Sequence, residues 1–194
     1  MRIEFYCTKG GKKLVYDALS GRYVLRSEKE LKKGDKPLNG TICAEARIYL
    51  IEEWETSEWE KDDDVDGKPY TMRGTDIGRK FVAKGGAFHK GEFWTSDSRE
   101  RNEIYRNSCL SQSDIEKYVG GIWKRFYCWR VYAASQTFPR ECANPPQSWR
   151  YDGKERNRIL MSINPKWLAK ILNGEKTIEV RKTAPKELVR YERE

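Results

Sequence analysis

Three charged side chains stand close together near the end of the sequence, in 174-GEKTIEVR-181. If 177-TIEVR-181 is a strand, its two-residue period turns Glu179 and Arg181 to the same face, roughly 7 Å apart along the strand. A carboxylate accepts hydrogen bonds and a guanidinium is a forked donor, so the two can pair together or bind a nucleobase edge or a phosphate. Lys176 lies before the strand, where the pleat does not fix its direction. Exposed ion pairs are common and weak, so the spacing alone leaves both interpretations open.

The sequence lacks the motifs of several enzyme classes. It contains no G-x-x-x-x-G-K-[ST], G-x-G-x-x-G or G-x-S-x-G, so nucleoside-triphosphate, dinucleotide and classical serine-hydrolase chemistry have no support. The only histidine is His89, which argues against histidine-dependent hydrolases and His-rich metal sites. Asp62 to Gly67 begins like an EF-hand loop, but Arg73 stands where the loop needs a bidentate glutamate. We therefore expect neither a metal site nor a cofactor.

The composition indicates a basic protein of one domain. A net charge of +8 over 194 residues permits a phosphate-bearing partner, but an ordinary charged surface explains it equally well. No signal-like segment and no run of 18 apolar residues is present, so we expect a soluble cytoplasmic protein without a membrane partner. The five cysteines form no CxxC pair, which favours small buried residues in a reducing compartment.

Hydrophobic periodicity predicts an α+β fold that is mostly β, a small barrel with two flanking helices. Ser111 and Asp114 form a capping box for one helix, and Asn164, Pro165 and Gly174 begin and end the other. We expect residues 54–107 to be an irregular insertion with short strands at 79–83 and 91–95, and 138–149 to be a Pro-containing loop. The other predicted elements are a hairpin of 2–7 with 13–16, a strand at 22–26, a central strand at 41–51, helices at 110–121 and 164–174, and strands at 123–133, 159–163 and 177–181.

The segment 160-LMSINPKWLAKILNGEKTIEVRK-182 resembles the signature of the ASCH domain, a branch of the PUA-like fold. That signature is a short strand ending in S-I-x-P, a helix, and then G-x-K-x-x-E-x-R. Its charged positions match Lys176, Glu179 and Arg181, and Ser162 and Gly174 match as well. Other stretches are similar to later parts of the ASCH proteins common in bacteria and their phages: 5-FYCTKGG-11, 40-GTICAEARIYLI-51, 109-CLSQSDIEKY-118, 126-FYCWRVY-132 and 145-PPQSW-149.

The order of these segments departs from the family, in which the helix and the G-x-K-x-x-E-x-R strand come first. Here the motif-bearing segment 159–194 stands at the end, which implies a circularly permuted ASCH domain over 1–194, with 150–158 as the new connector. Residues 182–194 should then meet residues 1–5, because permutation preserves a fold only if the old loop's ends stay adjacent. The alternative is that 159–181 docks on a neighbouring copy, so a monomer and a segment-swapped dimer are both open.

The resemblance implies a cleft between helix and sheet that binds RNA or a modified nucleoside or nucleotide. A base in such a cleft would stack on aromatic side chains and hydrogen-bond to polar ones beside a basic lip. Trp167, on the apolar stripe of its helix, is expected in the core instead. The residues implied are the stacking candidates Trp129, Tyr127 and Trp149, the basic Lys9, Lys176 and Arg181, and the hydrogen-bonding Ser162, Glu179 and Gln147.

Catalysis is a second implication of the resemblance. Some small ASCH proteins are amidohydrolases that deacetylate N4-acetylcytidine with a lysine, a threonine three residues later and a distant glutamate, and ribonuclease activity is known for others. Lys176 matches the lysine, but Glu179 stands at the nucleophile position, so the acyl-transfer route lacks its key part. Binding therefore ranks first, hydrolysis of a nucleoside or RNA by Lys176 and Glu179 second, and a phage-encoded inhibitor of a host defence protein third.

Overall fold

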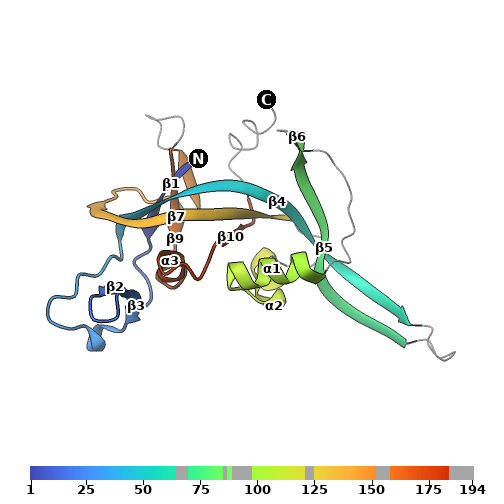
Figure 1. The fold of residues 1–194 in the computed structure, drawn as a ribbon, viewed down its shortest axis with the longest axis horizontal. Coiled ribbons are helices and arrows are strands. Elements are labelled where there is room, and N and C mark those ends of the chain that lie inside the picture. The colour runs from blue at the N-terminus through green and yellow to red at the C-terminus, as the bar shows by residue number, and fades with distance from the viewer. Residues whose placement is uncertain (64–69, 85–86, 89–97, 121–124, 152–157, 184–194) are drawn as a thin grey trace. The chain divides into compact units, whose positions relative to one another are not determined.

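The computed structural model describes residues 1–63, 70–84, 87–88, 98–120, 125–151 and 158–183 (Figure 1). The chain divides into two compact units. Unit 1 is Met1–Tyr49 with Val131–Thr177, and unit 2 is Leu50–Arg130 with Ile178–Glu194. Strands β4 (Thr41–Asp63) and β7 (Arg125–Glu141) each pass from one unit to the other. The described residues are mostly β with a few helices, which agrees with the predicted α+β class. The PUA-like barrel stays a prediction.

The sheet of unit 1 is built around its first strand, β1 (Arg2–Cys7). It pairs antiparallel with β4 and parallel with β9 (Arg158–Ile163), which pairs in turn with β8 (Trp149–Tyr151). On its other side β4 pairs with β7, so the order is β7-β4-β1-β9-β8. The apolar side chains of the two central strands form the core of this unit: Ile3, Phe5, Ile159 and Met161 are fully buried.

The predicted hairpin of 2–7 with 13–16 is wrong, although both segments are strands. β2 (Lys13–Asp17) pairs antiparallel with β3 (Arg22–Arg26) in a separate two-stranded sheet. Both edges of β1 are occupied by β4 and β9, so β2 has no place beside it. The Gly-Gly turn is a local signal and carries no information about these distant competitors.

The predicted central strand at 41–51 is confirmed as the first part of β4. Its alternating Ile42, Ala44, Ala46 and Ile48 are buried. The register against β1 shifts between Phe5, which faces Ala44, and Tyr6, which faces Ile42, so Cys43 is the extra residue of a β-bulge. Its thiol lies against that of Cys7, and a hydrogen bond between the two raises the pKa of Cys7 and lowers that of Cys43. All five cysteines are free thiols.

Helix α3 (Pro165–Leu172) follows β9 and begins and ends as predicted. The Asn164 side chain accepts the Lys166 N–H at 2.9 Å, and Gly174 adopts a φ of 74° that favours glycine. At its C-terminal end, Asn173 bonds the backbone of Tyr23 twice, at 2.9 and 2.8 Å. The helix end is thereby joined to β3 of the small hairpin.

In unit 2, much of the segment expected to be irregular is a long β-hairpin. β4 continues to Asp63 and pairs antiparallel with β5 (Tyr70–Lys84), which also pairs with the short β6 (Ala87–Phe88). Residues 79–83 lie within β5, whereas 91–95 and His89 fall outside the described residues. The segment has few apolar residues, so it shows no two-residue hydrophobic period that would predict strands. The two strands of this hairpin pair through their backbones, which does not require apolar side chains.

Two helices pack on the other part of unit 2, α1 (Ser98–Ser108) and α2 (Gln112–Val119). The capping box is confirmed, because Asp114 accepts the Ser111 N–H at 2.9 Å and its own N–H donates to Ser111 Oγ at 3.1 Å. β10 (Ile178–Arg181) pairs antiparallel with β7. One core joins these elements: Ile104, Ile115, Val119, Phe126, Cys128, Ile178 and Val180.

β7 is longer than the predicted strand 123–133, and it includes the start of the region expected to be a Pro-containing loop. It runs to Glu141 through Pro139, and Ala133 within it has a φ of 50°. The connector 150–158 begins as β8, and its residues 152–157 lie outside the described part, as do 184–194. The predicted meeting of residues 182–194 with 1–5 stays a prediction. No helix in the described residues is long and apolar enough to cross a membrane.

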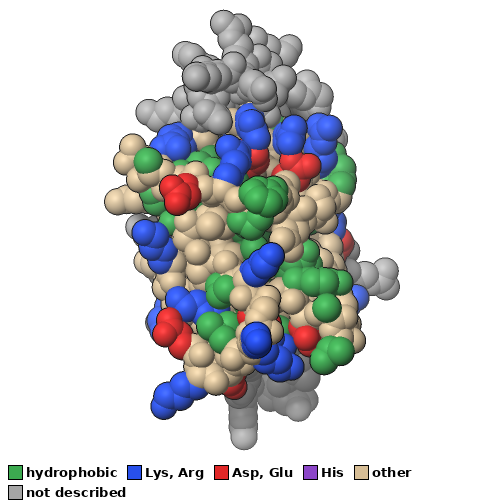
Figure 2. Space-filling model, turned by 90° about the vertical axis from the view of Figure 1, so that its left-hand side faces the viewer, with side chains coloured by type: hydrophobic (Ala, Val, Ile, Leu, Met, Phe, Trp, Pro, Cys, Tyr) green, Lys and Arg blue, Asp and Glu red, His purple; other side chains and the backbone are tan. Residues whose placement is uncertain are grey.

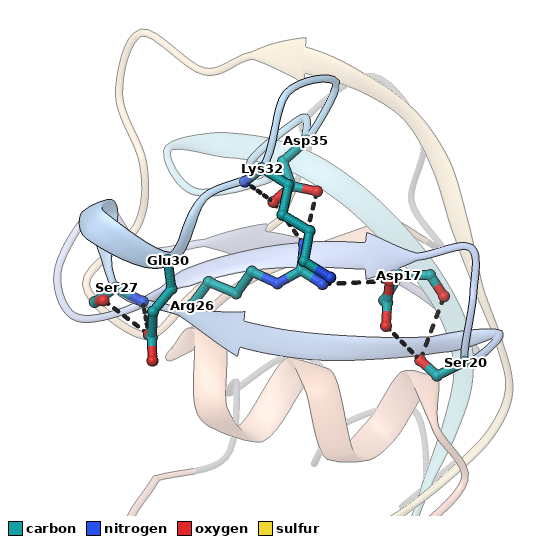
Figure 3. A network of polar contacts seen from close by, with 7 residues as sticks. All are labelled: Asp17, Ser20, Arg26, Ser27, Glu30, Lys32 and Asp35. Carbon is teal, nitrogen blue, oxygen red and sulfur yellow. Dashed lines mark hydrogen bonds and ion pairs between the residues drawn. The ribbon is translucent and has the colours of Figure 1, made fainter.

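Polar contacts around Arg26 hold the small hairpin to the turn that follows it (Figure 3). Its guanidinium contacts both Asp35 oxygens, at 2.8 and 2.6 Å, and an Asp17 oxygen at 3.2 Å. The pKa of Asp17 is lowered chiefly by the Ser20 hydroxyl, and that of Asp35 chiefly by the Lys32 N–H, with Arg26 adding to both. The 3-10 helix η1 (Glu28–Glu30) lies between these contacts.

These lowered pKa values predict a loss of stability in acid. Carboxylates whose pKa is lower in the folded state stabilise it above their unfolded-state pKa, near 4, and that contribution is lost as pH falls through the folded pKa. Asp35→Asn should therefore lower Tm at pH 7 and reduce the fall in Tm between about pH 5 and 2. The control is Glu141→Gln, which changes an exposed acid outside the network. An unchanged pH profile in Asp35→Asn would contradict the assignment.

Glu4 is the buried acid of β1, with 4% of its surface exposed. One carboxylate oxygen contacts Arg140 and the other contacts Arg158. The three side chains link strands β1, β7 and β9 of unit 1. Burying a carboxylate is costly unless it is paired and hydrogen-bonded, and the two guanidinium groups satisfy this requirement.

Glu4→Gln should lower the free energy of unfolding by about 1–3 kcal/mol, because the amide has no charge and keeps one acceptor oxygen where the carboxylate offers one to each guanidinium group. A urea titration followed by circular dichroism measures the change. Glu45→Gln is a matched control, since Glu45 faces Glu4 across the ladder and pairs with Arg2 at a more exposed position. Its cost should be about 0–1 kcal/mol. Equal costs for the two variants would refute a special role for the Glu4 contacts.

Candidate functional site

The alternation of β10 separates its apolar side chains from its charged ones. Ile178 and Val180 enter the core of unit 2, beside Phe126 and Cys128 of β7. The antiparallel register places Glu179 opposite Trp129 and Arg181 opposite Tyr127. Residues facing each other across a ladder share one face of the sheet, so the two charged and two aromatic side chains lie together on the second face. The sequence correctly predicted this division.

Glu179 and Arg181 form an ion pair in which Oε1 and Nε are 2.7 Å apart. The side chain of Glu179 is 7% exposed and that of Arg181 is 12% exposed. An ion pair of this kind is not the solvated surface pair that spacing alone permits, because both partners have lost most of their water. Trp129 is only 1% exposed and Tyr127 is half-buried, so Tyr127 presents more of its ring to a ligand.

Tyr118 of α2 is a neighbour of this pair that sequence reasoning missed. Burial is the main cause that raises its pKa; the Glu179 carboxylate adds to the increase, and the Arg181 guanidinium opposes it. The Lys182 Nζ lies 5.1 Å from the centroid of the Tyr118 ring, and 39% of the residue is exposed. The sequence places Tyr118 off the apolar stripe of α2, which indicates an exposed side chain. It gives no indication that Tyr118 lies near β10.

Lys176 is the charged motif residue of unit 1, and it is 2% exposed. The Gly174 turn directs the chain back over α3, where the backbone N–H groups of Glu175 and Lys176 both donate to Lys170 O, at 2.8 and 3.1 Å. This turn places the Lys176 Nζ 5.2 Å from the centroid of the Trp167 ring. Trp167, expected in the core, is half-buried.

Ser162 holds a loop in place. Its hydroxyl donates to Pro146 O, and its N–H donates to Ser148 O at 3.0 Å. These bonds fix 145-PPQSW-149 against the end of β9, with Gln147 exposed and Trp149 half-buried opposite Met161. The hydroxyl predicted to bind a ligand is therefore a donor to the backbone in this structure.

Lys9 lies in the exposed turn after β1, and its side chain packs over Gly40. A Cβ added at Gly40 would come within 3.2 Å of the Lys9 Cγ, and the φ of 81° at Gly40 also favours glycine. On the face of the molecule shown in Figure 2, Lys and Arg side chains are interspersed with acidic and hydrophobic ones. The charge of +8 is thus not gathered into a single patch on that face.

The comparisons with known proteins gave no match: no family model, no curated protein and no solved structure is similar to this chain at a significant level. Among the described residues, no group of three His, Cys, Asp or Glu side chains could hold a metal ion.

Ser162→Ala should loosen the 145-PPQSW-149 loop while the fold is retained. The variant removes the hydroxyl that bonds Pro146 O, and a typical hydrogen bond contributes about 0.5–1.5 kcal/mol. Hydrogen exchange followed by mass spectrometry should show roughly tenfold faster exchange in peptides covering 144–149. The reason is that the lost hydrogen bond lowers the free energy of local opening, and a lower opening free energy raises the exchange rate. Ser113→Ala, at an exposed position on α2, is the control. Unchanged exchange in the loop would rule out this role for Ser162.

Proposed function

We propose that this protein binds RNA or a modified nucleoside or nucleotide, and that Lys176, Glu179 and Arg181 contact the ligand. The observation that carries the proposal is the burial of three charged side chains within six residues of sequence. Lysine, glutamate and arginine are almost never buried without a specific reason, because each must give up its hydration. Functional sites are among the places where proteins keep charged groups buried, and structural ion-pair networks are the other.

The chemistry of the group suits a nucleobase and its phosphate. Glu179 supplies acceptors, Arg181 supplies a forked donor, and Tyr127 and Tyr118 supply aromatic surface in the same unit. Stacking on an aromatic ring contributes about 1–3 kcal/mol per base. Lys176 adds an ammonium group, which interacts with phosphate as a point charge. Lys9, Gln147, Trp149 and Trp129 complete the set of proposed contacts.

We further propose that the chain is a circularly permuted ASCH domain with a PUA-like barrel. The support is the motif match over 160–182 together with the parallel pairing of β1 with β9. These two strands lie near opposite ends of the sequence, and parallel neighbours need a long crossover connection. In the family order, the same two strands would be joined through the α3 segment instead. Within this chain, 158–163 pairs with residues 2–7 of the same molecule.

Hydrolysis of a nucleoside amide or RNA by Lys176 and Glu179 is ranked below binding. Glu179 is engaged by Arg181 and occupies the position where the amidohydrolases have their nucleophile. Inhibition of a host defence protein is ranked third, since no described feature specifies a protein partner. Both alternatives are outcomes of the experiment that tests binding.

We predict that wild-type protein binds single-stranded RNA or nucleosides in titration calorimetry, and that affinity for RNA falls steeply between about 50 and 200 mM salt. Glu179→Gln combined with Arg181→Gln should weaken binding about 10–100-fold, as expected for lost charge-assisted hydrogen bonds. Changing both residues avoids leaving one buried charge unpaired.

The control is Arg106→Gln, an exposed position on α1 in the same unit. Thermal melts of all variants separate lost binding from lost folding. Turnover of acylated nucleosides or RNA that is lost in Lys176→Ala would favour the hydrolase instead. A tight protein partner, with no binding of nucleosides or RNA, would refute the proposal and favour the inhibitor.

A further inference from the structure

Three lysines surround one indole in unit 1. The Nζ atoms of Lys166, Lys170 and Lys176 lie 4.6, 6.0 and 5.2 Å from the centroid of the Trp167 ring. The first two come from successive turns of α3, and the third is brought back by the Gly174 turn. We call this group the lysine cluster. Only Lys176 belongs to the motif from which binding was argued.

The lysine cluster is unfavourable for the helix that carries most of it. Lys166 and Lys170 are four residues apart, a spacing at which like charges destabilise a helix. Lys166 also lies in the first turn, where the helix dipole favours acids, and α3 has no acidic residue there. Within the described residues, neither Lys166 nor Lys170 takes part in an ion pair.

The indole face attracts each of the three ammonium groups, so the ring holds the positive charges together beside it. An anion with several oxygen atoms can accept from more than one ammonium group at once. Lys166 is exposed and Lys170 is half-buried, so an anion can approach both, and the buried Lys176 adds its positive charge from surroundings of lower dielectric. The half-buried Trp167 ring adds a flat apolar surface beside the charges.

From these observations we propose that the lysine cluster binds the phosphate group of a nucleotide. The ligand of the protein is then a phosphorylated nucleotide, free or at the end of an RNA, and not a bare nucleoside. This inference rests on the proposed function, because it specifies which form of the nucleic-acid ligand is bound. It adds Lys166, Lys170 and Trp167 to the binding residues, none of which the sequence motif indicated.

The test compares the same bases with and without phosphate. Total tRNA digested to 5′-mononucleotides, and an aliquot of that digest treated with phosphatase, are each equilibrated with the protein across an ultrafiltration membrane. Retained species are quantified by mass spectrometry, which also covers modified bases. For the base that is retained best, wild-type protein should bind the mononucleotide at least about tenfold more tightly than the nucleoside, the gain expected from a charge-assisted contact.

The decisive variant is Lys166→Gln combined with Lys170→Gln. It should lose most of the advantage in affinity that the mononucleotide has over the nucleoside. Lys29→Gln combined with Lys33→Gln removes the same charge from exposed positions elsewhere in unit 1 and should keep that advantage. RNA oligomers with a 5′-phosphate or a 5′-hydroxyl distinguish a terminal phosphate from the phosphodiester backbone.

Several results would overturn the inference. Equal binding of nucleoside and mononucleotide would refute it while the proposed function stands. Equal losses in the two double variants would show a general charge effect and no specific site. Inorganic phosphate binding as tightly as the mononucleotide would indicate an anion site unrelated to nucleotides. Retention of neither nucleosides, nucleotides nor RNA would refute the proposed function as well.

Discussion

The pairing of β1 with two partners is the constraint on which unit 1 depends. β1 is bonded along one edge to β4 and along the other to β9, and its apolar side chains have no exposed surface. The Thr8 N–H extends the parallel ladder by donating to Ile163 O at 3.0 Å, so the end of β9 is fixed. Helix α3 and the turn after it inherit this position, because Asn164 caps α3 one residue later and Gly174 directs the chain to Lys176. A polar cluster on α3 is therefore placed by a strand more than 150 residues earlier in the sequence.

Short-range signals predicted the elements of this structure better than their partners. The caps of α2 and α3, the alternation of β4 and the two faces of β10 are local properties, and each was predicted from a few residues. The hairpin of 2–7 with 13–16 failed because strand pairing is decided by competition among distant segments. The long ribbon of β4 and β5 was missed for another reason, since its polar residues give no hydrophobic period. The candidate site shows the same division. The two-residue period of a strand predicted that Glu179 and Arg181 share a face, whereas the surroundings of Tyr118, Lys166 and Lys170 depend on how distant chain segments meet.

Buried charge in the described residues falls into two classes, and the difference bears on function. Glu4 has two arginines, and Arg26 has two aspartates, so each of these groups is satisfied within the fold. Such groups hold strands and turns together, and their removal is expected to change stability. Glu179 and Arg181 are also paired, but they lie on the last strand of the sheet order, beside aromatic rings that a ligand could contact. Under the proposed function, a base binds beside this ion pair.

The lysine cluster differs from both classes, because its three ammonium groups lie around one indole ring. A protein under selection for stability alone would gain from an acidic residue in the first turn of α3, and the cost of exchanging Lys166 for one would be small. Retaining Lys166 and Lys170 four residues apart is understandable if the two bind an external anion, as we propose. The same reasoning explains why the composition was uninformative: eight excess positive charges spread over a surface say nothing, whereas three placed around one ring define a position. The location of these charges, and not the net charge, is the basis on which we propose a phosphate-bearing ligand.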